Sequence, residues 1–363
     1  MNILSEKIAR NIVQDCLCIC EEDTVLISTW QHTIDLVSQI ALECHKVGAK
    51  TLTSLDTDDV FYGSMRYEPL ESLKKPNKAL MGLWDHITAS IYLDGPEDPL
   101  RMRKISAERW AAMSEGDKPF MDMVLKKKKR SIYVTLGLVT PQRAKTYGFK
   151  YQAWKRAVTD ATTVSYAFLT RFGKKVKATL EKAKEVQITG KGVKLSFRLE
   201  DRPIHVLDGV VDEEDMKTGA FDATLPAGSV SVAPAETSGE GTVQFDLPIA
   251  TVGKLVHGLK WSFKNGKLTE YRAKRNVEAA RGWWEKAHGD KDRIGSLTLG
   301  INPKAKFGFL NNPIVQGAVT IGIGDNRFLG GTNNSDYAFE GTLSKATVKL
   351  DRKTIIKGGK YAF

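Results

Sequence analysis

Cysteine, histidine and long apolar runs are scarce in this sequence, and each scarcity excludes a class of protein. The 363 residues include 4 cysteines and 6 histidines, far too few cysteines for a disulfide-stabilised secreted scaffold. The longest apolar stretches, such as Ser131–Val139, are much shorter than the roughly 20 residues of a membrane-spanning helix. The N-terminal residues Met1–Lys7 turn polar at once and predict no secretory signal. We therefore expect a cytoplasmic protein without a membrane partner.

Three of the cysteines, Cys16, Cys18 and Cys20, alternate near the N-terminus, and the fourth is Cys44. In a large chain without a secretory signal they are expected to be reduced thiols. A zinc site is the alternative, although this spacing is tighter than that of the usual structural zinc sites. The pattern by itself assigns these cysteines no role.

Positive charge exceeds negative charge, with a formal net charge of +11 and an isoelectric point near 9.3. The densest basic cluster, Lys126–Arg130, leads directly into the apolar run Ser131–Val139. This order predicts a solvated loop that enters a buried strand. Nucleic-acid modules usually interleave basic residues with exposed aromatic residues on one face, and no recognisable motif of that kind appears here, which argues against a nucleic-acid partner. An anion- or nucleic-acid-binding protein stays open as an alternative that rests on net charge alone.

The first half of the chain alternates predicted strands and helices, which favours an α/β domain over residues 1–185. Apolar runs at Thr24–Ser28, Lys50–Leu55 and Ala89–Leu93 predict strands, and Thr33–Val47 carries the apolar periodicity of a helix. This β-α-β-α-β order implies a parallel sheet with right-handed crossovers. No glycine-rich phosphate loop follows any of these strands, so a nucleotide site is unsupported.

Residues 186–363 change in character, with short strands and frequent turn signals, and predict a β-rich α+β domain. Asn265-Gly266 between two strand-like runs predicts a hairpin with a type I′ turn. One helix is expected around Val277–Lys286.

Three segments of the second half carry a family resemblance. In chain order they are Thr224-Leu225-Pro226-Ala227-Gly228-Ser229-Val230 with the following Glu236 and Glu240-Gly241-Thr242-Val243, then Ile294–Pro303, then Ile321-Gly322-Ile323-Gly324-Asp325 with Gly330–Ser335. Together with Thr24–Ile27 and Val47–Lys50 in the first half, they resemble the aminopeptidase T family of thermophilic metalloaminopeptidases. The resemblance implies a homodimer with an active site that holds two divalent metals and removes N-terminal residues from peptides.

Most positions where the resemblance places metal ligands carry other residues in this sequence. The first glutamate is present as Glu240, and the closing His-x-Asp motif falls on Ala338-Phe339-Glu340. Ser296 occupies the position of a second glutamate, and about Thr320 that of a histidine. No histidine follows His288 in the sequence. Glu240 and Glu340, with Asp325 or Asp336 as further candidates, would make a carboxylate-only set, which suits magnesium or calcium better than zinc or cobalt.

The leading hypothesis is an aminopeptidase T-like pseudoenzyme that has lost its dinuclear-metal peptidase activity and binds a peptide or small molecule in a dimer cavity. No cofactor is then expected, and the catalytic residues are unknown. The first alternative is an active metal-dependent aminopeptidase with a carboxylate site at Glu240 and Glu340, holding magnesium, calcium, zinc or cobalt. A ring-cleaving dioxygenase-like enzyme is a further alternative, but its iron would need histidines near Ser296 and Ala338.

Overall fold

The computed structural model describes residues 3–93, 95–251 and 254–363 and divides the chain into two compact units. Unit 1 comprises Met1–Thr163 and Gly209–Pro226, and unit 2 comprises Val164–Asp208 and Ala227–Phe363. The chain therefore passes between the units three times, at 163/164, 208/209 and 226/227. The boundary expected between residues 185 and 186 lies inside unit 2, whose first helix already begins before it.

Unit 1 is built on a five-stranded parallel sheet, as the βαβ pattern predicts. In spatial order its strands are β2 (Lys50–Asp56), β1 (Thr24–Trp30), β3 (Ala89–Leu93), β4 (Arg130–Val134) and β8 (Asp222–Leu225). The predicted strands at β1, β2 and β3 are confirmed. β8 belongs to the segment 186–363, which the sequence assigns to the β-rich domain, yet it pairs with β4 through Ser131↔Asp222 to Val134↔Leu225.

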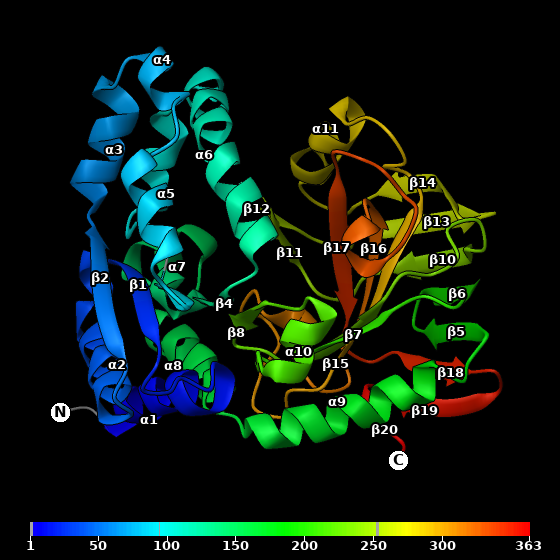
Figure 1. Ribbon diagram of the computed structural model, residues 1–363. Coiled ribbons are helices and arrows are strands. Elements are labelled where there is room, and N and C mark those ends of the chain that lie inside the picture. Colours follow the sequence, from blue (N-terminus) through cyan, green and yellow to red (C-terminus); the bar gives the residue numbers. More distant parts are fainter. Residues whose placement is uncertain (1–2, 94, 252–253) are drawn as a thin grey trace. The chain divides into compact units, whose positions relative to one another are not determined.

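Helices and one π-helical turn surround this sheet (Figure 1). They are α1 (Ile3–Arg10), the π-helical Asn11–Cys16, α2 (Ile34–Lys46), α3 (Asp58–Tyr67), α4 (Leu70–Leu73), α5 (Lys78–Asp85), α6 (Ala107–Lys127), α7 (Pro141–Tyr147), α8 (Tyr151–Thr162) and α10 (Glu213–Thr218). Trp84 of α5 is buried against Leu26 of β1, and its ring meets that of Phe120 of α6 edge to face with centroids 5.4 Å apart. This apolar cluster holds α5 and α6 against the sheet.

The basic cluster Lys126–Arg130 only partly follows the prediction of a solvated loop, because its first two lysines end α6. Lys127 forms an ion pair with Asp85, and Arg130 forms one with the buried Asp23 at 2.5 Å. Lys129 donates a hydrogen bond to the carbonyl of Ile87. These contacts hold the N-terminal ends of the strands together, which accounts for much of the local positive charge without an external anion.

Unit 2 contains two larger antiparallel sheets and a short hairpin. The eight-stranded sheet runs β14 (Lys267–Arg272), β13 (Lys260–Lys264), β10 (Glu240–Gln244), β6 (Val193–Arg198), β5 (Glu185–Gly190), β18 (Thr347–Leu350), β19 (Lys353–Lys357) and β20 (Lys360–Tyr361). The five-stranded sheet runs β17 (Ala338–Leu343), β16 (Val319–Gly324), β15 (Ile294–Gly300), β9 (Ser229–Val232) and β7 (Ile204–Leu207). The hairpin pairs β11 (Ile249–Thr251) with β12 (Lys254–Val256), and the helices are α9 (Tyr166–Leu180) and α11 (Val277–Lys286).

Two local predictions for unit 2 are confirmed. Asn265 and Gly266 join β13 to β14 with φ of 51° and 73°, the left-handed values that a type I′ hairpin turn requires. The predicted helix coincides with α11. Among the residues that the structure describes, no helix is long and apolar enough to cross a membrane.

Candidate functional site

One face of the five-stranded sheet of unit 2 is apolar, and the other carries hydroxyl groups, glycine, a carboxylate and, on the edge strand β7, the imidazole of His205. Strand residues alternate between the faces, so Leu297, Ile321 and Leu343 lie on one face with Gly341, where a Cβ would collide with the ring of Phe245. The alternate residues form the opposite face, which we call the polar face. It includes Ser231, Ser296, Thr298, Thr320, Gly322, Ala338, Glu340 and Thr342.

Four hydroxyl groups on the polar face are buried and bonded to one another in pairs. Ser231 lies opposite Thr298 with their oxygens 2.8 Å apart, and Thr320 lies opposite Thr342, also at 2.8 Å. Cross-strand hydroxyl pairs of this kind satisfy buried polar atoms without a ligand. The hydroxyl of Thr320 is thus hydrogen-bonded to the neighbouring strand β17.

Ser296, Gly322 and Glu340 form the adjacent row of the polar face, on β15, β16 and β17. Gly322 has no side chain, and a Cβ built there would collide with the hydroxyl of Ser296. The hydroxyl of Ser296 therefore occupies the space over Gly322, in the same row as the carboxyl group of Glu340. Solvent reaches the side chain of Glu340, yet desolvation by the surrounding protein raises the pKa of its carboxyl. Within the described part of the chain, no hydrogen bond or ion pair engages that carboxyl group.

The other acidic candidates are occupied by local contacts. Glu240 lies on β10 of the eight-stranded sheet, where its Oε1 accepts a 2.6 Å hydrogen bond from the backbone N–H of Asn265. Asp325 forms an ion pair with Arg327 at 2.6 Å, and Asp336 accepts a 2.6 Å hydrogen bond from the N–H of His288. Glu240 therefore supports the β13–β14 turn, on a different sheet from Glu340.

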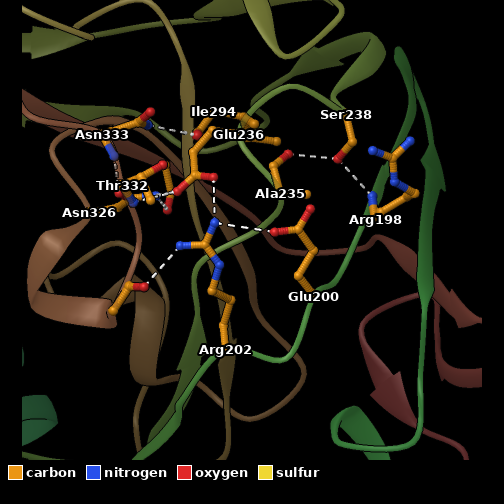
Figure 2. Close-up of polar contacts among 12 residues, drawn as sticks. Arg198, Glu200, Arg202, Ala235, Glu236, Ser238, Ile294, Asn326, Thr332 and Asn333 are labelled. Carbon is orange, nitrogen blue, oxygen red and sulfur yellow. Dashed lines mark hydrogen bonds and ion pairs between the residues drawn. The ribbon is translucent and has the colours of Figure 1, made fainter.

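A buried carboxylate outside the expected ligand set, Glu236, lies at the centre of a polar network (Figure 2). Its Oε1 accepts hydrogen bonds from the N–H of Thr332 at 2.7 Å and from Asn326 at 3.1 Å, and its Oε2 pairs with Arg202 at 2.8 Å. Burial alone would raise the pKa of Glu236, but these hydrogen bonds and the guanidinium charge together hold it below its usual range.

The same network anchors the loop that precedes β17. Asn326 also donates to the carbonyl of Gly295, and Asn333 donates to the carbonyls of Ile294 and Gly324 at 3.0 Å. The loop is thereby attached to the beginning of β15 and the end of β16. We conclude that Glu236 positions the end of the polar face and does not itself point to a ligand.

Comparison with known proteins places the sequence in a family. The sequence model of the thermophilic metalloprotease family M29 matches residues 2–303 of this chain. The chain belongs to that family. The comparison with curated proteins found no match.

Two solved structures share the fold of this M29 member. Wild-type AmpT from Thermus thermophilus aligns with a TM-score of 0.78 at 18% identity and covers 99% of each chain. A 2,5-dihydroxypyridine dioxygenase from Pseudomonas putida KT2440 aligns with a TM-score of 0.63 at 13% identity, over 99% of this chain and 96% of that chain. The likeness to AmpT confirms the predicted α/β domain with a parallel sheet and the β-rich α+β domain. At these identities it shows the fold and not the chemistry.

The polar face brings together four positions that the family resemblance assigns to metal ligands. Ser296, Thr320, Ala338 and Glu340 all project from it, on three neighbouring strands. Zinc and cobalt sites need imidazole, thiolate or carboxylate ligands, and of these only the carboxylate of Glu340 is present in the set. In the described residues, no group of three or more His, Cys, Asp or Glu side chains is arranged to hold a metal ion. The residues on this face do not fit a dinuclear metal centre.

Proposed function

We propose that this M29 protein binds the amino-terminal end of a peptide on the polar face and does not carry out dinuclear-metal peptide hydrolysis. The observation that carries the proposal is the row Ser296–Gly322–Glu340, in which a carboxyl group without a protein partner among the described residues lies across a glycine from a hydroxyl group. The side chains around it supply hydroxyl and methyl groups where a metal pair would need carboxylates and imidazoles.

The chemistry of this row suits a free peptide N-terminus. The α-ammonium group of a peptide would pair with the carboxylate of Glu340, and this charge-assisted contact offsets the desolvation that raises the carboxyl pKa. The hydroxyl of Ser296 can donate to a peptide carbonyl or accept from a peptide N–H. Because Gly322 has no side chain, the hydroxyl of Ser296 can lie over it, in the same row as the carboxyl group of Glu340.

The assembly and location belong to the same proposal. The resemblance to the aminopeptidase T family supports a homodimer whose cavity would enclose the bound peptide. Cys18, Cys20 and Cys44 are free thiols in the structure, and free thiols are typical of a reducing cytoplasm.

Calorimetric titration with Leu-Gly-Gly and with its N-acetylated form, both in the presence of a chelator, tests this function. A charge-assisted hydrogen bond contributes about 1.5–3 kcal/mol, so acetylation or the substitution Glu340→Gln should each weaken binding by roughly 10- to 100-fold. The matched control is Glu278→Gln on α11, a carboxylate at the surface beside Lys254, which should leave the affinity unchanged. Equal affinity for both peptides would contradict the proposal, as would hydrolysis of Leu-Gly-Gly that the chelator abolishes.

A further inference from the structure

A cavity of about 760 Å³ lies in unit 1, and its lining residues are independent of the proposed function. Its walls come from α1, α2 and α8, from the turn after β1, and from the segments after β3 and β4. His32 and Thr33 follow β1, Glu97 follows β3, and Leu136 and Thr140 follow β4. Three neighbouring parallel strands therefore direct their carboxyl ends towards one space.

The strand order explains why the space opens there. From β1 the chain crosses to β2 on one side, and from β2 it returns past β1 to β3 on the other side. Crossovers between parallel strands are right-handed, so the two connections leave the sheet on opposite faces and a crevice remains between the ends of β1 and β3. Open α/β sheets bind their ligands at such switch points. The cavity thus lies at the kind of position where open α/β sheets bind small molecules.

The charged groups of the lining select the kind of ligand. Asp35 and Glu97 contribute two carboxylates, and Lys155 contributes one ammonium group. Among the described residues, no hydrogen bond reaches the carboxylate oxygens of Asp35 or Glu97, because the hydrogen bonds of Glu97 come from its backbone. The ammonium group of Lys155 lies over the ring of Tyr151, 5.8 Å from the ring centroid. The lining thus carries an excess of negative charge in a protein whose net charge is +11.

The remaining groups of the lining are held by hydrogen bonds within unit 1 or supply an apolar wall. The Nε2 of His32 lies 2.7 Å from the carbonyl oxygen of Gly137 and donates to it. The hydroxyl of Thr140 is already committed, since it donates to the carbonyl of Glu97 at 2.8 Å and accepts from the N–H of Arg143. Leu36 and Leu136 supply apolar surface.

Phosphate is a poor match for this lining, even though the cavity lies at the beginning of α2. The first turn of α2 contains Asp35, whose charge opposes an anion at the positive end of the helix. The segment after β1, Gln31–Thr33, contains no glycine to bring backbone N–H groups close to a phosphate. A donor-rich cation complements the acceptor-rich walls.

We propose that this cavity binds a small organic cation with N–H donors, an ammonium or guanidinium group on an apolar body. The cationic head would pair with Glu97 and Asp35, and the body would lie against Leu36 and Leu136. The residues that set specificity are the two carboxylates. Lys155 limits the affinity, because its charge repels the same head group.

A ¹⁹F NMR titration of the full chain with 4-fluorophenethylamine tests the proposal, with 4-fluorophenylacetate and 4-fluorophenethyl alcohol as the anionic and neutral probes of the same shape. The amine should bind saturably, and at least about fivefold more tightly than either other probe. Preference for the acetate, or equal binding of all three probes, would overturn the assignment. Displacement of the amine by millimolar inorganic phosphate at constant ionic strength would also overturn it.

Three variants fix the location and the sign of the charge effect. Glu97→Gln should weaken amine binding by roughly three- to tenfold, and Lys155→Gln should strengthen it or leave it unchanged. All these titrations use the Glu340→Gln background, so that the ammonium group of the probe cannot pair at the proposed peptide site, and Glu278→Gln, at a surface carboxylate of unit 2, should have no effect. Weaker amine binding in Lys155→Gln, or unchanged binding in Glu97→Gln, would refute the cavity as a cation site.

Discussion

Replacing Glu236 by alanine should destabilise unit 2 more than replacing any exposed carboxylate. The side chain of Glu236 is 8% exposed and that of its partner Arg202 is 13% exposed, so the substitution leaves a guanidinium largely buried without its main counter-charge. It also removes the acceptor for the N–H of Thr332 and for the amide of Asn326. Breaking a buried ion pair by removing one partner costs about 3–5 kcal/mol.

The lower end of that range applies here, because Arg202 keeps two other contacts. Its guanidinium still donates to the carbonyl of Gly330 at 2.9 Å and remains 3.3 Å from Glu200. A decrease of about 3 kcal/mol in the free energy of unfolding, with a urea m-value of about 3 kcal/mol/M, lowers the urea midpoint of unfolding by about 1 M. Glu236→Gln should fall between Glu236→Ala and the wild type, because it keeps the shape of the side chain and loses the charge.

Urea denaturation followed by circular dichroism measures the global effect, and hydrogen exchange of the Thr332 amide measures the local one. The matched control is Glu200→Ala, which removes a carboxylate from the same Arg202 but at a side chain that is 52% exposed. The free energy of unfolding of that control should fall by less than about 1 kcal/mol. Equal losses for the Glu236 and Glu200 variants, or unchanged exchange at Thr332, would refute the role given to the network.

Three further outcomes follow from the same residues. Because the pKa of Glu236 is lowered from its ordinary 4.5, its contribution to stability is present above that value and is lost as pH falls through the folded-state pKa. The free energy of unfolding of Glu236→Gln, measured by urea denaturation at several acid pH values, should therefore change less with pH than that of the wild type. Because the pKa of Glu340 is raised from 4.5, peptide affinity should be full above the raised value and decline as pH falls through it, already above pH 4.5; a titration series across that range checks this, and a flat profile would contradict the pairing. Gly322→Val puts a side chain where the hydroxyl of Ser296 lies and so displaces that hydroxyl, which should reduce peptide binding by at least about tenfold with little change in the circular dichroism spectrum; unchanged affinity would place the peptide elsewhere.

Local patterns in the sequence are sufficient to predict several elements. The strands β1, β2 and β3 and the helices α2 and α11 follow from apolar periodicity, and the β13–β14 turn follows from Asn265-Gly266. In each case the deciding interactions lie within a few residues along the chain. The alternation of faces along β17 likewise suffices to place Ala338 and Glu340 on the same face.

Other features depend on contacts between distant segments, which a single sequence does not display. The four residues of β8 have no strong strand pattern, and they join the parallel sheet only because β4, about ninety residues earlier, offers an open edge. The role of Glu236 requires Arg202, Asn326 and Thr332 to meet in space. The helix α6 is not predicted by the sequence, since charged residues and Pro119 interrupt its apolar pattern. The cavity at the ends of β1, β3 and β4 likewise depends on the strand order.

The most direct test of the account is the metal content of the purified protein after dialysis against a mixture of magnesium, calcium, manganese, cobalt and zinc salts. The polar face offers Ser296, Thr320, Ala338 and Glu340 where a dinuclear centre needs several carboxylates and imidazoles. We expect substoichiometric metal by inductively coupled plasma mass spectrometry, with no difference between the wild type and Glu340→Gln. About two equivalents of one metal per chain, lost in Glu340→Gln, would contradict the central claim and identify an active metal centre on this face.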